Sequence, residues 1–301
     1  MVKKLVLLVV GIMMAALFAG CGNDAPKEQA SKKIQVVTSF NAMAEFTKAI
    51  GGDKVEVSTI IPDGVEPHEF ELKPENMKQL ATAQVFVYNG FGMEPWAKQA
   101  IEAAKNDKLV TVVATEGVEA IKNTDPEEIK EHGAEDPHAW LSLKDAKIEV
   151  KNIKDALVKA DPANKDYYEK NYTEYVGKLD AMIKKYEEQF AKAPHKNFVT
   201  GHAAFAYLSR DFGLEQNSVE DVFAEGEPNA AQLAKLIEYV KENNIKTIFA
   251  EEMASPEVSK TLAKEVGAKV ETIYTIESKE DDKTYLQRMD ENLAKIAESL
   301  K

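Results

Sequence analysis

Segments typical of β-strands and of helices alternate along two separate stretches of this chain. In the first stretch, short runs rich in valine and isoleucine lie at 34–38, 55–60, 85–88 and 109–113, and amphipathic segments lie between them at 41–50, 74–83 and 94–105. In the second, the strand-like runs are 198–200, 247–250 and 269–274, and the helical segments are 203–212, 230–243, 256–266 and 283–300. Such alternation predicts parallel sheets with helices packed on their faces. We therefore expect an α/β fold with two lobes, each a mostly parallel sheet flanked by helices.

The region between these stretches has a different pattern. From 164 to 193 there is no strand-like run, and large apolar side chains recur every three or four residues: Tyr168, Tyr172, Tyr175, Leu179, Met182, Ile183, Tyr186 and Phe190. This spacing predicts one amphipathic helix, roughly 40 Å long at about 1.5 Å per residue. We interpret its apolar stripe as core packing and its role as a rigid link between the lobes. The expected domains are an N-terminal lobe at 34–160, the linking helix at 161–193 and a C-terminal lobe at 194–301.

The N-terminus has the pattern of an export signal. Lys3 and Lys4 precede an apolar run at 5–18, which is shorter than the roughly 20 residues that a membrane-spanning helix needs. The run leads into Leu-Phe-Ala-Gly-Cys at 17–21, which resembles the lipobox of bacterial lipoproteins; a plain secretory signal is the alternative. We expect a lipoprotein signal peptide at 1–20, lipidation of Cys21, and a flexible polar tether at 21–33.

Charge and cysteine content limit the kinds of site that the chain can build. The net charge is −13, which argues against nucleic-acid binding because neutralising phosphates needs a basic surface. Cys21 is the only cysteine, so we expect no internal disulfide and no thiolate ligand within the fold. A metal site would have to use histidine and carboxylate.

Two of the five histidines follow an acid–proline pair, in Glu66-Pro67-His68 and Asp136-Pro137-His138. Proline fixes its own φ and disfavours helix at the residue before it, so each imidazole is expected on a stiff, non-helical turn. Ligands of open α/β sheets bind beyond the carboxyl ends of the strands, and in two-lobed proteins they often bind between lobes. Three candidates follow predicted strands and the fourth ends an acidic loop; they are His68, His202, Glu277 and His138.

Three imidazoles and a carboxylate form a suitable tetrahedral set for Zn²⁺. Carboxylates normally orient such imidazoles from behind, and the candidates for this role are Glu66, Asp136 and Glu251. The other two histidines have a simpler interpretation: His132 is expected on an exposed loop, with an auxiliary ligand as the alternative, and His195 on the surface. Glu280, Asp281 and Asp282 are further acids close to Glu277.

Several motifs resemble, in order, the metal-binding segments of the metal-specific solute-binding lipoproteins of ABC transporters, and the zinc-uptake group is the most similar. They are Val-Glu-Pro-His-Glu-Phe-Glu-Leu at 65–72, Asp-Pro-His-Ala-Trp-Leu at 136–141 and Thr-Gly-His-Ala-Ala-Phe at 200–205. The segments 227–233 and 248–251 resemble that family's C-terminal lobe. The resemblance implies that His68 and His138 are ligands from one lobe, with His202 and Glu277 from the other. A carboxylate is common at the third position in manganese-type relatives, so His202 implies zinc.

The resemblance also implies a function. The chain would be a lipid-anchored, extracytoplasmic monomer that captures Zn²⁺ between its lobes and delivers it to a membrane permease with a cytoplasmic ATPase, without catalysing a reaction. One alternative is a Mn²⁺ or iron carrier on the same scaffold. A zinc hydrolase would need an open coordination position and a general base, and an adhesin-like lipoprotein would hold its metal for structure only.

Overall fold

The computed structural model describes residues 33–123, 129–130, 133–223, 229–251 and 256–301. Residues Lys33–Lys301 form one compact unit. The predicted signal peptide, Cys21, most of the tether and the loop residue His132 lie outside the described residues. Within the described part of the chain, no helix is both long and apolar enough to cross a membrane.

The first sheet consists of four parallel strands in the order β2-β1-β3-β4. The strands are β1 (Ile34–Thr38), β2 (Val55–Thr59), β3 (Val85–Tyr88) and β4 (Val110–Val113). Each lies within a predicted strand-like run, and β2 and β4 are one residue shorter than expected. Val36 of β1 pairs with Val57 on one side and Val85 on the other, which places β1 and β3 at the centre of the sheet.

The second sheet repeats this arrangement in the order β6-β5-β7-β8, again all parallel. Its strands are β5 (Asn197–Thr200), β6 (Glu215–Ser218), β7 (Thr247–Ala250) and β8 (Lys269–Thr272). Strand β6 was not predicted, because its residues Glu-Gln-Asn-Ser are polar and it forms a partly exposed edge of the sheet. The strand predicted at 269–274 ends at Thr272. In both sheets the strand order reverses beside the first strand, which is where open α/β sheets bind ligands.

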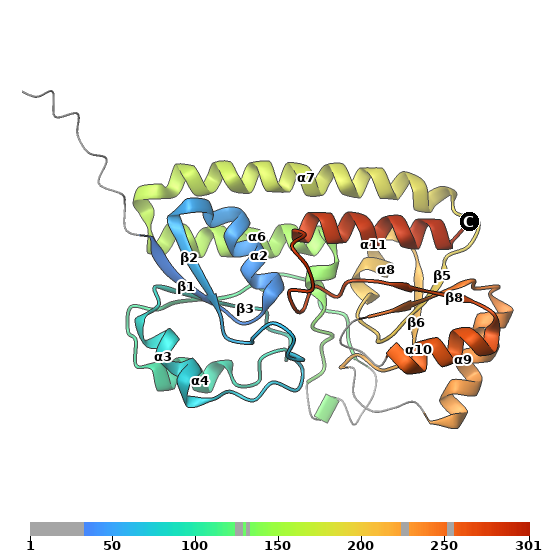
Figure 1. The fold of residues 1–301 in the computed structure, drawn as a ribbon. Coiled ribbons are helices and arrows are strands. Elements are labelled where there is room, and N and C mark those ends of the chain that lie inside the picture. The colour runs from blue at the N-terminus through green and yellow to red at the C-terminus, as the bar shows by residue number, and fades with distance from the viewer. Residues whose placement is uncertain (1–32, 124–128, 131–132, 224–228, 252–255) are drawn as a thin grey trace, which may run out of the picture. The chain divides into compact units, whose positions relative to one another are not determined.

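Helices cover both sides of the sheets (Figure 1). On one side lie α2 (Asn41–Gly51), α6 (Leu143–Ala160), α7 (Lys165–Lys192), α8 (Ala206–Phe212) and α11 (Tyr285–Ser299). On the other side lie α3 (Pro74–Thr82), α4 (Ala97–Ala104), α9 (Ala230–Glu242) and α10 (Pro256–Val266). The described residues also form three short 3₁₀ turns: η1 (Gly52–Lys54), η2 (Ala139–Leu141) and η3 (Pro162–Asn164). The helices predicted at 94–105 and 203–212 begin three residues later than expected.

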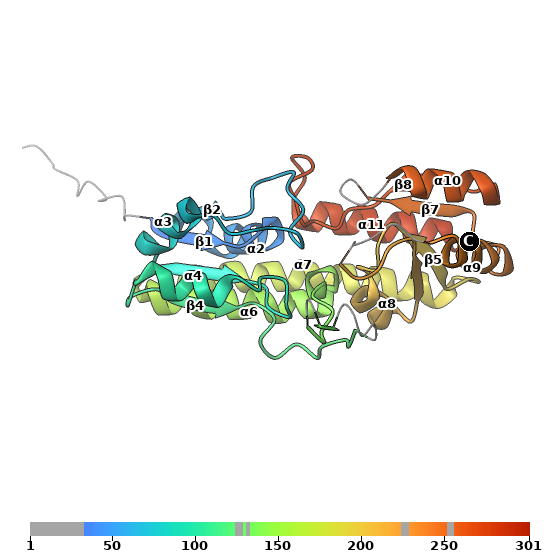
Figure 2. The ribbon, with the colours of Figure 1, turned by 90° about the horizontal axis from the view of Figure 1, so that it is seen from below.

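The long helix α7 runs past both sheets (Figure 2). It packs against α2 and α6 on the side of the first sheet, and against α8 and α11 on the side of the second. Six of the eight predicted stripe residues are buried, and Tyr172 and Met182 pack partly buried against the same core. The helix begins at Lys165 and not at 161, because Pro162 disfavours helix at Asp161 and residues 162–164 form the 3₁₀ turn η3.

Helix α6 was not predicted, although its sequence carries a helical pattern. Leu143, Ala146, Val150, Ile153 and Leu157 are buried and spaced three or four residues apart. Its start is fixed by Ser142, whose Oγ accepts a hydrogen bond from the backbone N–H of Asp145 at 2.9 Å. The helix follows directly from η2 and so connects the Asp136-Pro137-His138 turn to the core.

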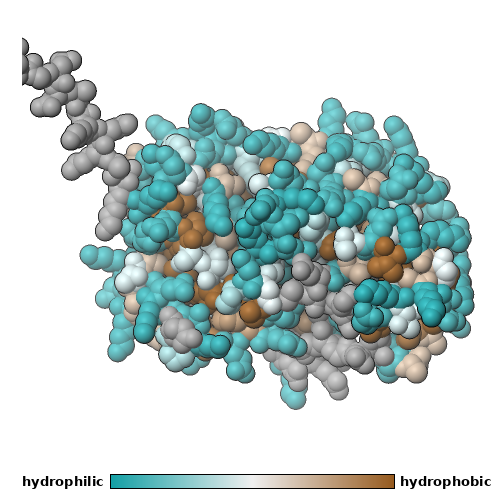
Figure 3. Space-filling view, in the orientation of Figure 1, coloured by the Kyte–Doolittle hydropathy of each residue, from teal (hydrophilic) through white to brown (hydrophobic). Residues whose placement is uncertain are grey.

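One continuous hydrophobic core joins the two sheets. It contains Val36 and Phe86 from the first sheet, Tyr168 from α7, and Phe198 and Phe249 from the second sheet. A second, smaller cluster lies under α9 and α10. Hydrophilic residues dominate the face seen in Figure 3, where hydrophobic residues form small separate groups. The linking helices and the shared core explain why both sheets belong to one compact unit.

Candidate metal centre

Four side chains from separate parts of the chain converge at the carboxyl ends of the two sheets. They are the four residues singled out from the sequence: His68, His138, His202 and Glu277. Each offers one ligand atom, and these atoms all lie within 4.8 Å of one another. His68 comes from the loop after β2, His138 precedes η2, His202 follows β5 and Glu277 follows β8.

The donor atoms lie close enough together to share one small cation. The Nε2 atom of His138 lies 3.2 Å from the Nε2 atoms of both His68 and His202. Glu277 Oε1 lies 3.6 Å from Nε2 of His68, 3.3 Å from Nε2 of His138 and 3.7 Å from Nε2 of His202. A tetrahedral Zn²⁺ with bonds of about 2.0–2.1 Å has donor atoms about 3.3–3.4 Å apart. The spacing therefore suits one small, four-coordinate cation.

His138 is oriented by the acid of its own turn. Its Nδ1 lies 2.8 Å from Asp136 Oδ1, and its backbone N–H donates to the same oxygen at 2.9 Å. Burial lowers the pKa of His138, but the hydrogen bond and charge of Asp136 outweigh burial and raise it. Because the carboxylate accepts the Nδ1 proton, the Nε2 lone pair faces the other donors. Tyr207 secures the turn by donating its hydroxyl to the Asp136 carbonyl at 2.6 Å.

His202 is held in the same manner by a residue from the neighbouring strand. Its Nδ1 makes a very short contact with Glu251 Oε2, and its backbone N–H donates to Glu251 Oε1 at 3.2 Å. Burial lowers the pKa of His202, but the charge of Glu251 outweighs it and the pKa is raised well above its ordinary value. Glu251 directly follows β7, the central strand beside β5. Two adjacent strand ends thus supply an imidazole and the carboxylate that orients it.

His68 lacks such a partner. Its Nδ1 is buried and has no hydrogen-bond partner among the described residues. Glu66, the third candidate for an orienting acid, accepts a hydrogen bond from the backbone N–H of His68 at 3.2 Å and not from its imidazole ring. Burial lowers the pKa of His68 to about 4. Burial also raises the pKa of Glu66 to about 7, with the nearby charge of Glu277 as the next cause.

Glu277 faces the three imidazoles through one oxygen only. Burial raises its pKa, but the imidazoles outweigh burial and hold the pKa well below its ordinary value. The competing acid Asp281 instead receives hydrogen bonds from Arg288 Nε at 3.0 Å and from the backbone N–H of Lys283 at 2.9 Å. Asp282 is exposed beside Lys279. His195 is exposed on the surface, as predicted.

The segment that carries Glu277 is bonded to the first half of the chain. Trp140 Nε1 donates to the Thr275 carbonyl at 2.7 Å, and Asn41 Nδ2 donates to the Ile276 carbonyl at 3.2 Å. The backbone N–H of Asn41 donates to the Glu277 carbonyl at 3.3 Å. Sequence analysis did not find these positioning residues, since no local pattern links Asn41 or Trp140 to a residue more than 130 positions away.

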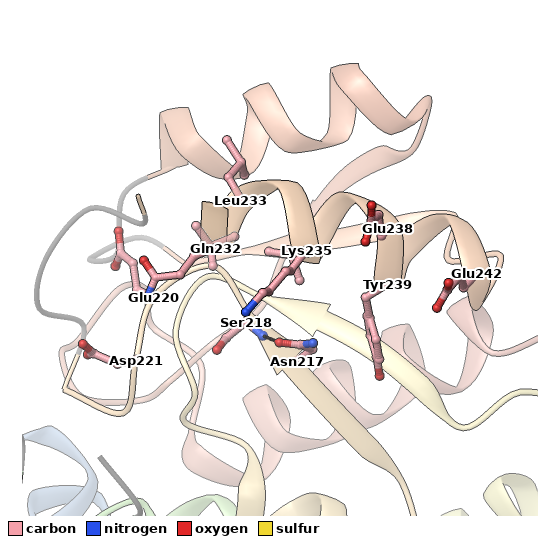
Figure 4. Close-up of a pocket in the computed structure, with 12 residues that line it drawn as sticks. Asn217, Ser218, Glu220, Asp221, Gln232, Leu233, Lys235, Glu238, Tyr239 and Glu242 are labelled. Atoms are coloured by element: carbon pink, nitrogen blue, oxygen red, sulfur yellow. Dashed lines mark hydrogen bonds between the residues drawn. The ribbon is translucent and has the colours of Figure 1, made fainter. Parts of the chain in front are cut away.

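A surface pocket of about 560 Å³ lies elsewhere, between α9 and the end of β6 (Figure 4). Its lining carries the acids Glu220, Asp221, Glu238 and Glu242, together with Lys235 and Tyr239. The pocket contains no histidine. Its lining therefore cannot supply the imidazole donors found at the four-residue cluster.

Comparison with known proteins places the chain in a family. Residues 36–299 match the family described as zinc-uptake complex component A, periplasmic. The chain belongs to this family. It is 42% identical over 299 residues to the high-affinity zinc uptake system protein ZnuA of Bacillus subtilis, with 94% of each chain covered.

Solved structures of similar proteins have the same fold as this member of the zinc-uptake family. The Zn(II)-bound ZnuA-like domain of Streptococcus pneumoniae AdcA superposes with a TM-score of 0.76 at 36% identity, covering 89% of this chain and 99% of that one. The laminin-binding protein of Streptococcus agalactiae, described as bifunctional with adhesin and metal-transporting activity, superposes with a TM-score of 0.80 at 33% identity, covering 89% of this chain and 100% of that one. The expected family and the expected α/β fold with two parallel sheets are confirmed.

Proposed function

We propose that this chain is the zinc-capturing component of a zinc-uptake ABC transporter. It binds one Zn²⁺ between the two sheets through Nε2 of His68, His138 and His202 and through Oε1 of Glu277. The observation that carries the proposal is the convergence of these four donors within 4.8 Å of one another, with five of their six separations at 3.2–3.7 Å. Family membership and the zinc-bound relative support the same cation.

The donor set favours zinc over the alternative cargoes. Three imidazoles and one carboxylate oxygen suit Zn²⁺, whereas Mn²⁺ prefers sites richer in carboxylate and water. A hydrolase would keep one coordination position for a reactive water, but four protein donors complete a tetrahedral shell. We therefore propose a carrier with no catalytic activity. Laminin binding or adhesion is named for several similar structures, but it would not explain four converging donors.

The remaining assignments concern the setting in which the carrier works. Residues 1–20 are a lipoprotein signal peptide, Cys21 carries the lipid, and 21–33 form the tether. The N-terminal lobe spans 34–160, the linking segment that contains α7 spans 161–193, and the C-terminal lobe spans 194–301. The mature protein is a monomer at the outer face of the cytoplasmic membrane, where it delivers Zn²⁺ to a permease with its cytoplasmic ATPase.

The proposal is tested by growth under zinc limitation. A strain that lacks this protein and any redundant zinc importer should grow poorly when zinc is chelated, and the wild-type chain should restore growth. The variant His202→Ala should fail to restore it at equal protein abundance, whereas the surface variant His195→Ala should succeed. Normal growth of the strain without the protein would contradict a role in zinc uptake.

A further inference from the structure

The two carboxylate oxygens of Glu277 have different surroundings. Oε1 faces the three imidazoles at 3.3–3.7 Å. Oε2 accepts a hydrogen bond from the hydroxyl of Thr275 at 3.0 Å. Both side chains are buried, with 3% of each residue exposed, so water does not compete freely for either group. The Thr275 hydroxyl thus occupies the oxygen that would otherwise be free to serve as a second donor.

The backbone around this pair is held in a conformation that it would not adopt readily by itself. Ile276, between Thr275 and Glu277, has φ of 62°, a left-handed value that is rare for a β-branched residue. Such conformations are unfavourable by themselves and persist where the surroundings impose them. Here Trp140 and Asn41 bond the carbonyls of three consecutive residues, 275–277.

Since the backbone is fixed, side-chain rotation is the main freedom left to Glu277. A rotation that presented both oxygens to the cation would break the hydrogen bond from Thr275. A hydrogen bond to a charged group is stronger than one between neutral groups, so this bond opposes the rotation. The carboxylate is therefore held with one oxygen toward the imidazoles and the other toward the hydroxyl.

The number of carboxylate oxygens offered affects which cation the site prefers. One oxygen and three nitrogens give four donors, which suits Zn²⁺. Two oxygens would give five, with more oxygen character, and would favour cations such as Mn²⁺ that take more ligands. We propose that Thr275 is a specificity-determining residue: its hydroxyl keeps Glu277 monodentate and so selects Zn²⁺ over Mn²⁺. This inference rests on the proposed zinc-binding function.

The test compares Thr275→Val, which removes the hydroxyl and keeps the shape, with Thr275→Ser, which retains a hydroxyl. Thr247→Val is a matched control, because Thr247 is also buried and its hydroxyl has no hydrogen-bond partner among the described residues. Zn²⁺ and Mn²⁺ affinities are measured by competition with a chromophoric chelator. X-ray absorption spectroscopy of each loaded protein gives the number of oxygen and nitrogen donors.

We expect the ratio of Zn²⁺ to Mn²⁺ affinity to fall about tenfold in Thr275→Val, the size expected for losing one charged hydrogen bond. The same variant should gain an oxygen donor when loaded with Mn²⁺, while Thr275→Ser and Thr247→Val match the wild type. An unchanged ratio in a folded Thr275→Val would overturn the inference. A bidentate Glu277 in the zinc-loaded wild type would also overturn it, even if the valine variant fails to fold. In either case zinc binding by the wild type would stand, whereas failure of the wild type to bind zinc would refute the proposed function itself.

Discussion

The Nε2 atoms of His138 and His202 lie 3.2 Å apart, although the two residues are separated by 64 positions in the chain. A carboxylate accepts from the Nδ1 of each ring, so both lone pairs point into the same small space. Two lone pairs at this distance repel each other unless a proton or a cation lies between them. The proposed Zn²⁺ would lie between these two lone pairs and remove the repulsion.

Removing one imidazole should weaken zinc binding strongly. In His202→Ala we expect the dissociation constant for Zn²⁺ to rise by more than ~100-fold, because loss of even an outer partner of a metal ligand typically costs 10–100-fold. Competition titration against a chelator of known affinity measures the change. His195→Ala, at an exposed histidine, is the control and should bind as the wild type does. Equal affinity in His202→Ala and the control would show that this imidazole is not a ligand.

The carboxylates behind the imidazoles should matter less than the imidazoles but still measurably. Asp136→Asn keeps the size of the side chain and removes its charge, so His138 loses the group that holds its tautomer. We expect zinc affinity to fall about 10–100-fold. Asp180→Asn on α7, which removes an ion pair with Lys147 of α6 at the surface, should have no effect on affinity. An affinity loss shared equally by the two variants would point to a general charge effect.

Zinc binding should weaken as the pH falls from 7.5 to 5. A protonated imidazole cannot bind metal, so Zn²⁺ must displace any proton on Nε2. Asp136 raises the pKa of His138 and Glu251 raises that of His202, so these residues take up protons first as the pH falls. The pKa of His68, lowered to about 4 by burial, keeps that imidazole neutral over the whole range.

The pH dependence is measured as the zinc affinity at several pH values in buffers that do not bind metal. In Asp136→Asn the fall in affinity should move to lower pH, because the carboxylate that raises the pKa of His138 is gone. An affinity that stays constant from pH 7.5 to 5 would contradict a site built on three histidines.

Glu149 in α6 should destabilise the fold at neutral and alkaline pH. It is fully buried, and neither carboxylate oxygen has a hydrogen-bond partner among the described residues. Burial, with the charges of Asp145 and Glu94, raises its pKa well above the ordinary value. The folded state therefore retains a proton that the unfolded chain releases, so the stabilisation present below the unfolded pKa of about 4.5 is lost as the pH rises toward the folded pKa.

Replacing this carboxyl group should accordingly raise stability. We expect Glu149→Met to increase the free energy of unfolding by about 1–3 kcal/mol, with a larger gain at pH 8 than at pH 6. Chemical unfolding of the metal-free protein measures this, because bound metal would add its own stabilisation. Glu188→Met, at an exposed position of α7, is the control and should change little. A gain that is smaller at pH 8 than at pH 6 would reverse the expected sign.

Much of the fold could be predicted from the sequence because its elements carry strong local patterns. Valine-rich runs such as β1 and the aromatic stripe of α7 bury large apolar side chains at regular spacing. Strand β6 could not be found this way, since its residues are polar. Backbone hydrogen bonds to β5 stabilise its strand conformation at a partly exposed edge of the sheet. Helix α6 carried a readable period and was missed because many lysines and acids lie between its buried residues.

Some residues of the site could likewise be predicted from the sequence, and others could not. The acid–proline–histidine turns marked His68 and His138, and the strand ends marked His202 and Glu277, so the four residues that converge could be named from the sequence. The roles of Thr275, Trp140 and Asn41 depend on contacts between distant segments, so no local pattern reveals them. Of the three acids considered, the structure distinguishes Asp136 and Glu251, which contact imidazole rings, from Glu66, which binds only backbone.

The four donors are proposed to select and hold one Zn²⁺. The most direct test is metal analysis of the purified wild-type chain together with a competition titration between Zn²⁺ and Mn²⁺. We predict one Zn²⁺ per chain and a clear preference for Zn²⁺ at equal concentrations of the two free ions. A chain that binds Mn²⁺ more tightly than Zn²⁺, or that binds no metal, would contradict this description of the site.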